Sequence, residues 1–237
     1  MRIYVVSCDK GRQERLLRAA APLNLDIEIV DSPLSTEEEV VRRGNTCFER
    51  KTAYPTGVAA TLGHIRAMVK FLETGEPLGV IIEDDVRFHK LFNEKLKILE
   101  AYTLKNIEKF DVFSIGFCSK PFEVTPYEPI GGDMNAMLTC NMELSNPWGA
   151  QCYIITRKYA RFFTELFSIE DDLSIPYPYQ FVTDCVIFDP ERTILCRRNT
   201  LQYPIAIEDP TEQTLAGNAN KRDMFKFVHP CDFYMLS

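Results

Sequence analysis

The apolar residues of the chain fall into short runs and into stretches with helical spacing. Runs at 2–7, 26–30 and 77–86 predict strands, and the last of these is expected to be buried on both faces of a sheet. Apolar side chains three or four positions apart predict helices over 11–21 and 56–72. The opening order of strand, helix and strand is typical of an α/β protein with a doubly wound sheet, whose ligands bind outside the carboxyl ends of the strands.

The same alternation continues through the rest of the chain. Strands are predicted at 111–117 and from 149 onward, the latter followed by a helix over 157–167. An amphipathic surface helix is predicted over 88–110. Between 119 and 146 several prolines and glycines indicate a long irregular segment, which we interpret as a functional loop or small hairpin.

Three polar residues follow the first predicted strand and are candidates for the rim of the ligand crevice. Ser7 ends the strand, and Asp9 and Arg12 open the next helix. Each of them, taken singly, is equally compatible with an ordinary turn or helix-start residue. We place Ser7 and Arg12 among the candidate ligand-binding residues.

The segment between the second strand and the long helix is harder to interpret. A helix-start pattern at 35–39 is expected to end quickly at Gly44 and Asn45, leaving a loop near the ligand crevice as far as Thr56. In the next helix His64 lies off the main apolar stripe. We interpret His64 as a structural or substrate-positioning residue rather than a base.

Three consecutive acids end the apolar strand at 77–86. Glu83, Asp84 and Asp85 follow a β-branched run, and carboxylates crowded at a strand end repel one another unless a positive group neutralises them. A hard divalent cation, Mg²⁺ or Mn²⁺, that also holds a substrate pyrophosphate would do so. The alternative is that Asp84 or Asp85 caps a helix that starts near Phe88.

Composition narrows the class of protein. The chain has 237 residues, and its net charge of -7 and pI near 5.1 argue against a dedicated nucleic-acid surface. No segment approaches the roughly 20 apolar residues of a membrane span, and the first apolar run is too short for a signal peptide. We therefore expect a cytoplasmic protein with at most peripheral membrane contact. The eight scattered cysteines contain no Cys-x-x-Cys pair, which favours reduced thiols, although an even count also permits disulfides.

Two segments combine into a recognisable pattern. A helix carrying Gly63-His64-Ile65-Arg66 precedes the strand Gly79-Val-Ile-Ile-Glu-Asp-Asp-Val86, and a strand, turn and helix follow from Gly149 to Phe163. This pattern resembles glycosyltransferase family 25, the lipopolysaccharide-biosynthesis type. The resemblance implies a GT-A fold, a Rossmann-like mixed and mainly parallel sheet flanked by helices in a single domain over 1–237. Residues 1–118 would form the nucleotide-sugar- and metal-binding half, and residues 119–237 the acceptor-side half with a C-terminal tail.

The resemblance also implies a reaction and its residues. A sugar would pass, with inversion, from a nucleoside-diphosphate sugar, most often a UDP-sugar, to a hydroxyl group of a glycan or glycolipid. Asp85 and Glu83 would hold Mn²⁺ or Mg²⁺, with Glu83 and Asp84 orienting the donor. Asp184 is the expected base, and its alternative is a helix cap or paired surface acid. The tail offers further candidates for closing over the diphosphate: Lys221, Arg222 and His229.

Two other functions remain open. A nucleotidyltransferase acting on sugar phosphates also uses a metal and strand-end acids, but its glycine-rich phosphate loop is poorly matched by Cys8-Asp-Lys-Gly-Arg12. A non-catalytic GT-A-like binding module is the second alternative. The presence of all three acids at 83–85 argues against it.

Overall fold

The computed structural model describes residues 1–49, 54–117, 127–137, 149–168, 183, 187 and 197–209. Four of the residues singled out in the sequence lie outside this part of the chain: Asp184, Lys221, Arg222 and His229.

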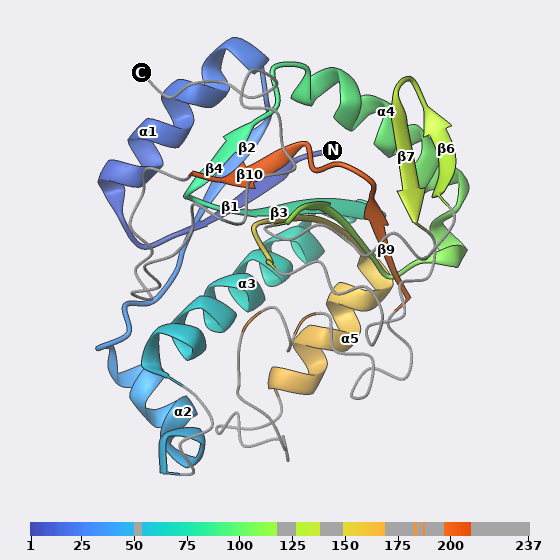
Figure 1. The fold of residues 1–237 in the computed structure, drawn as a ribbon. Helices are drawn as coiled ribbons and strands as arrows, with labels where there is room; N and C mark the ends of the chain where they lie inside the picture. Colours follow the sequence, from blue (N-terminus) through green and yellow to red (C-terminus); the bar gives the residue numbers. More distant parts are fainter. Residues whose placement is uncertain are drawn as a thin grey trace.

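A mixed sheet of ten strands forms the centre of the described chain (Figure 1). The strands are β1 Ile3–Ser7, β2 Ile27–Asp31, β3 Leu78–Glu83, β4 Val86–Phe88, β5 Val112–Gly116, β6 Tyr127–Gly131, β7 Met134–Met137, β8 Cys152–Thr156, β9 Arg198–Leu201 and β10 Ala206–Glu208. Their order is β2-β1-β3-β8-β5-β9-β7-β6, and β10 pairs with β4 and β5 beside this path. The strands β1, β2 and β3 are parallel, β8 runs antiparallel between β3 and β5, and β9 is parallel to β5.

Helices cover both faces of this sheet (Figure 1). They are α1 Lys10–Ala20, α2 Glu38–Glu49, α3 Pro55–Thr74, α4 Phe92–Lys105 and α5 Arg157–Ser168, with short 3-10 turns at Ala21–Leu23 and Ile107–Lys109. The helices α3 and α5 pack on one face of the sheet, and α1 and α4 pack on the other. This three-layer arrangement confirms the predicted fold class, an α/β protein with a mixed sheet flanked by helices.

Neighbouring residues of the central strands point into two separate cores. Tyr4 and Ile81 pack with α3 and α5, whereas Val5 and Ile82 pack with α1 and α4. A strand covered on both sides needs apolar residues at every position, which explains the continuous run that predicted β3. Between β3 and β5 lies β8, so the sheet interleaves strands from the two predicted halves of the chain.

Helix α3 approaches the sheet more closely than its apolar spacing suggests. His64, predicted to lie off the apolar stripe of this helix, is fully buried. Gly63 allows the close approach, because a Cβ atom there would lie 2.4 Å from Oγ of Ser32 and 2.5 Å from Cγ1 of Val6. The absence of a side chain lets α3 pack against β1, and His64 is buried next to Gly63 as a result.

The predicted end of the second helix is wrong. Helix α2 continues through Gly44 and Asn45 to Glu49, so the first part of the predicted loop is helical. Val40 is completely buried and packs α2 against the core beside α3. Tertiary packing of this kind routinely overrides the weak helix propensity of glycine and asparagine.

The segment after the acids also differs from the prediction. Residues Val86–Phe88 form the strand β4, and α4 begins only at Phe92 and ends at Lys105. The partner of β4 is β10, a strand from the far end of the described chain, and local periodicity cannot reveal such a pairing. The small hairpin predicted within 119–146 is present as β6 and β7. None of the helices in the described segments has both the length and the apolar character needed to cross a membrane.

Candidate functional site

A cavity of about 380 Å³ lies where β1 and β3 end and α1 begins. Parallel strands in an α/β sheet bring their carboxyl ends to one edge, which is where ligands of such folds bind. Five of the six predicted site residues line this cavity, and the sixth, Asp184, lies outside the described residues. The cavity is lined by Val6, Ser7, Cys8, Arg12, Ser32, Pro33, Leu34, Ser35, Thr56, Ala59, Ala60, His64, Glu83, Asp84, Asp85 and Glu208.

The acids of the site sit at a sharp turn rather than at a helix start. Glu83 is the last residue of β3, Asp84 and Asp85 form the turn, and Val86 opens β4. The predicted alternative, in which Asp84 or Asp85 caps a helix near Phe88, is therefore wrong. The turn directs the acids toward the cavity.

Arg12 bridges two of the three carboxylates. Its Nη1 lies 3.3 Å from Oδ1 of Asp84 and 3.6 Å from Oδ2 of Asp85, and all three side chains are almost fully buried. Ser7 donates a hydrogen bond of 2.5 Å to the other oxygen of Asp84. One guanidinium group therefore supplies the positive charge that the crowded acids require.

Burial controls the ionisation of the groups beside Arg12. The pKa of Asp84 is raised, because burial penalises the charged carboxylate more than the hydrogen bond from Ser7 and the charge of Arg12 stabilise it. Burial and the nearby charge of Asp84 also raise the pKa of the Cys8 thiol. A protonated thiol is a poor nucleophile, which argues against covalent catalysis by Cys8.

The raised pKa of Asp84 predicts a pH-dependent cost to the fold. The folded protein binds the proton of Asp84 more tightly than the unfolded chain does. Protonated Asp84 therefore contributes its full stabilisation of the fold below the unfolded-state pKa of about 4. It is lost as the pH rises through the folded-state pKa. We therefore expect Asp84→Asn to raise the free energy of unfolding relative to the wild type near neutral pH, and this gain to shrink toward about pH 4. Urea unfolding at a series of pH values measures the gain in the free energy of unfolding at neutral pH and its decrease toward about pH 4.

A carboxylate with the opposite shift provides the control. Lys95 lowers the pKa of Asp133, so Asp133→Asn should lose stability above about pH 4 rather than gain it. That loss will be small because Asp133 is exposed. A variant Asp84→Asn that is less stable than the wild type at neutral pH would show that Ser7 and Arg12 outweigh burial.

His64 connects the third acid to the core. Its Nε2 lies 3.3 Å from Oε1 of Glu83, and its Nδ1 lies 2.9 Å from the hydroxyl oxygen of Tyr153 on β8. The two rings are stacked with their centroids 5.7 Å apart. This geometry agrees with the interpretation of His64 as a positioning residue, because its ring is occupied on both nitrogens.

The sequence interpretation missed the contribution of β10. Glu208 lines the cavity, and the backbone N–H of Asp209 donates a hydrogen bond of 2.6 Å to the carbonyl oxygen of Asp85. An ion pair of 2.8 Å between Nη2 of Arg87 and Oδ1 of Asp209 fastens the same turn. A signal for these residues was present: an apolar run ends in two acids at 205–209, as it does at 80–84.

The carboxylates of the site are of the type that binds a divalent cation when a substrate supplies the remaining ligands. Within the described segments, no group of three or more His, Cys, Asp or Glu side chains could hold a metal ion by itself. Magnesium at phosphate-binding sites usually takes one or two carboxylates and fills its remaining positions with water and phosphate oxygens. Asp85 and Glu83 offer such oxygens in one cavity.

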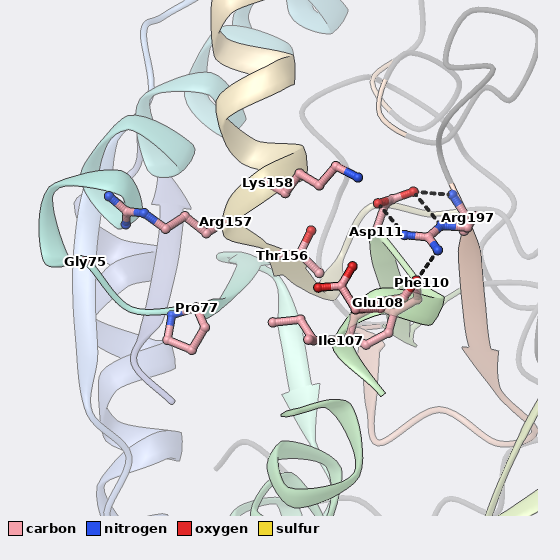
Figure 2. A pocket seen from close by; sticks show the side chains of 10 residues that line it. All are labelled: Gly75, Pro77, Ile107, Glu108, Phe110, Asp111, Thr156, Arg157, Lys158 and Arg197. Carbon is pink, nitrogen blue, oxygen red and sulfur yellow. Dashed lines mark hydrogen bonds and ion pairs between the residues drawn. The ribbon is translucent and has the colours of Figure 1, made fainter. Parts of the chain in front are cut away.

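A second cavity of about 230 Å³ lies at the opposite edge of the sheet, where β5 and β9 begin (Figure 2). Its buried acid, Asp111, faces Arg197, whose Nε and Nη2 each lie 3.3 Å from a carboxylate oxygen. Nη2 of Arg157 donates to the carbonyl oxygen of Leu72. Because this cavity lies where strands begin, whereas ligands of α/β sheets bind outside the carboxyl ends of the strands, we do not consider it the functional site.

No family model matches the chain, so the resemblance to glycosyltransferase family 25 is not confirmed, and no curated protein matches it. Among solved structures, the chain is similar to a glycosyltransferase involved in the glycosylation of the major capsid of PBCV-1, with 11% identity and a TM-score of 0.45 over 94% of this chain and 95% of that chain. It is also similar to the inositol-1-phosphate CTP transferase from T. maritima, with 11% identity and a TM-score of 0.38 over 96% of this chain and 77% of that chain. Similarities at this level carry no weight for the reaction, and the proposal below rests on the residues of the cavity.

Proposed function

We propose that this protein is a metal-dependent glycosyltransferase of the GT-A type, which transfers a sugar from a nucleoside-diphosphate sugar to a hydroxyl group of a glycan or glycolipid with inversion. One observation carries the proposal: Glu83, Asp84 and Asp85 line a single cavity with Arg12 and Ser7 at the carboxyl ends of β1 and β3. A cavity that combines acids with a buried cationic side chain suits a ligand that brings both a metal and phosphates.

Each residue has a proposed role. Asp85 ligates the divalent cation, and Glu83 either joins it or orients the ribose or sugar of the donor together with Asp84. A bound cation stabilises the negative charge of the diphosphate leaving group as the glycosidic bond breaks. Arg12 shares that task, because its guanidinium already lies beside the carboxylates. Asp184 remains the proposed base that accepts the proton of the acceptor hydroxyl.

The start of α1 favours glycosyl transfer over nucleotidyl transfer. Phosphate-binding loops present the free backbone N–H groups of a helix N-terminus to the ligand. Here the carboxylate of Asp9 accepts the N–H of Arg12 at 3.0 Å, and this hydrogen bond lowers the pKa of Asp9. A negative charge therefore already occupies the end of the helix where such a loop would bind phosphate.

A thermal-shift panel tests the proposal. UDP-, GDP-, dTDP- and CMP-sugars are added singly, each with and without Mn²⁺. Ligand at about 100 times its Kd stabilises the folded state by about 2.7 kcal/mol, which corresponds to a rise in Tm of about 5–10 °C for a chain of this size. We expect such a rise with one nucleotide sugar, UDP-sugars first, and only with Mn²⁺ present.

The other outcomes discriminate between the alternatives. A nucleotidyltransferase also binds a nucleotide sugar, as its product, so release of pyrophosphate from a nucleoside triphosphate and a sugar phosphate would favour that enzyme, and release of nucleoside diphosphate from the nucleotide sugar would favour a glycosyltransferase. Metal-dependent binding without any release of nucleoside diphosphate, even with acceptor glycans present, would favour the non-catalytic binding module. No shift in any arm would overturn the donor assignment.

A further inference from the structure

Two buried side chains, Tyr153 and His64, are linked by a hydrogen bond, and a second hydrogen bond links His64 to the carboxylate of Glu83. Tyr153 lies directly opposite Ile81 in the antiparallel pair of β3 and β8, and its hydroxyl contacts Nδ1 of His64 at 2.9 Å. Nε2 of His64 contacts Oε1 of Glu83 at 3.3 Å. Tyr153 and His64 are both completely buried, whereas the side chain of Glu83 is 30% exposed in the cavity.

When His64 is neutral, the chemistry of the three groups fixes the direction of these hydrogen bonds. Burial raises the pKa of Tyr153 well above its ordinary value, and the charge of Glu83 adds to this effect, so the hydroxyl keeps its proton and can donate it. A carboxylate only accepts, so the nitrogen of His64 that faces Glu83 must carry a proton. A neutral imidazole with its proton on Nε2 accepts at Nδ1, which is where the hydroxyl of Tyr153 lies.

Glu83 contacts the core through His64, and its side chain is also 30% exposed at the cavity. One oxygen of its carboxylate accepts from His64, and the side chain borders the cavity with Asp84 and Asp85. A carboxylate fixed by a partner in the core is suited to accepting hydrogen bonds from a ligand, because little conformational entropy is lost when the ligand binds. Hydroxyl groups are the donors that a sugar nucleotide would present to it.

We propose that Tyr153 and His64 are positioning residues that hold Glu83 as the hydrogen-bond acceptor for a hydroxyl group of the donor. The proposal rests on the proposed function, and it assigns Glu83 to hydroxyl recognition while Asp85 is left as the cation ligand. Tyr153 touches no ligand in this scheme. Its hydroxyl acts on binding only through His64 and Glu83.

A double-mutant cycle tests this coupling. Binding of the nucleotide sugar that the thermal-shift panel identifies is measured by calorimetry with Mn²⁺. We expect Tyr153→Phe to raise the Kd by about three- to tenfold, the value of one hydrogen bond. In a Glu83→Gln background, which itself binds more weakly, the same change should have little further effect.

Tyr159 provides the matched control. It is another buried tyrosine, and its hydroxyl donates a hydrogen bond of 2.8 Å to the carbonyl oxygen of Ile187, outside the residues that line the cavity. Tyr159→Phe should lower stability without changing the Kd. An equal effect of Tyr153→Phe with and without Glu83, or no effect in either background, would overturn the positioning role while leaving the proposed function intact. Wild-type protein that binds no nucleotide would instead overturn the proposed function.

Nitrogen-15 NMR of the His64 ring supplies a readout independent of ligand. At a pH where the ring is neutral, the wild type should show the tautomer with its proton on Nε2. Tyr153→Phe removes the partner of Nδ1, and Glu83→Gln replaces the charged acceptor at Nε2 by a neutral amide, so each should shift the ring toward a mixture of tautomers. A wild-type ring with its proton on Nδ1 alone would show that the direction of these hydrogen bonds is wrong.

Discussion

Replacing Asp85 by asparagine should abolish metal-dependent hydrolysis of the nucleotide-sugar donor and leave the protein folded. The side chain keeps its shape but loses the charge that would hold the cation, and a cation at a phosphoryl leaving group contributes several kcal/mol to the transition state. A loss of this size corresponds to a decrease in kcat/KM of at least about 100-fold. Release of nucleoside diphosphate, measured over a range of Mn²⁺ concentrations, checks the prediction.

Asp111 provides a control for the loss of a buried, arginine-paired carboxylate. It lies at the opposite edge of the sheet and is bound to Arg197, as Asp85 is bound to Arg12. Asp111→Asn should lower the Tm while its hydrolysis rate stays at the wild-type value. Unchanged hydrolysis in Asp85→Asn would rule out Asp85 as the cation ligand.

Replacing Arg12 by glutamine should destabilise the metal-free protein by about 3–5 kcal/mol. Removing one partner of a buried ion pair leaves the remaining charges uncompensated, and here two carboxylates, Asp84 and Asp85, lose the same guanidinium. If these acids form the cation site, Mn²⁺ can replace the lost positive charge. We therefore expect millimolar Mn²⁺ to recover much of the lost stability in the variant and to have little effect on the wild type without donor.

Arg18 is the matched control on the same helix. Its ion pair within the described residues is with Glu14, and both side chains are largely exposed, so Arg18→Gln should change stability by less than about 1 kcal/mol. Thermal unfolding of both variants with Mn²⁺, and with the chelator EDTA, separates the two cases. Should Mn²⁺ leave the Tm of Arg12→Gln unchanged, the carboxylates would not form a joint cation site.

The parts of the fold that were predicted correctly depend on local patterns. The run at 80–82 predicted β3 because a strand covered on both faces must be apolar throughout. The predictions failed where packing between distant segments decides the outcome. Val40, buried beside α3, carries α2 past Gly44, and Gly63 brings α3 close enough to β1 to bury His64. Neither contact leaves a periodic signal in the sequence.

The candidate site shows the same division. Ser7, Arg12 and the acids could be placed together because the ends of neighbouring parallel strands share one edge of the sheet. Tyr153 and Glu208 could not, since their positions depend on antiparallel pairs, β3 with β8 and β4 with β10, whose register the apolar pattern does not determine.

The contacts between β10 and the turn at Asp84 and Asp85 affect when the site forms during synthesis of the chain. The backbone N–H of Asp209 donates to the carbonyl oxygen of Asp85, and Glu208 lines the cavity. Both residues lie far downstream of the three acids in the sequence. Domains form as the chain leaves the ribosome, N-terminal segments first. A nascent chain that has not yet released β10 carries all three acids of the turn without the contacts that fix them, so we expect the capacity to bind donor to appear only late in translation.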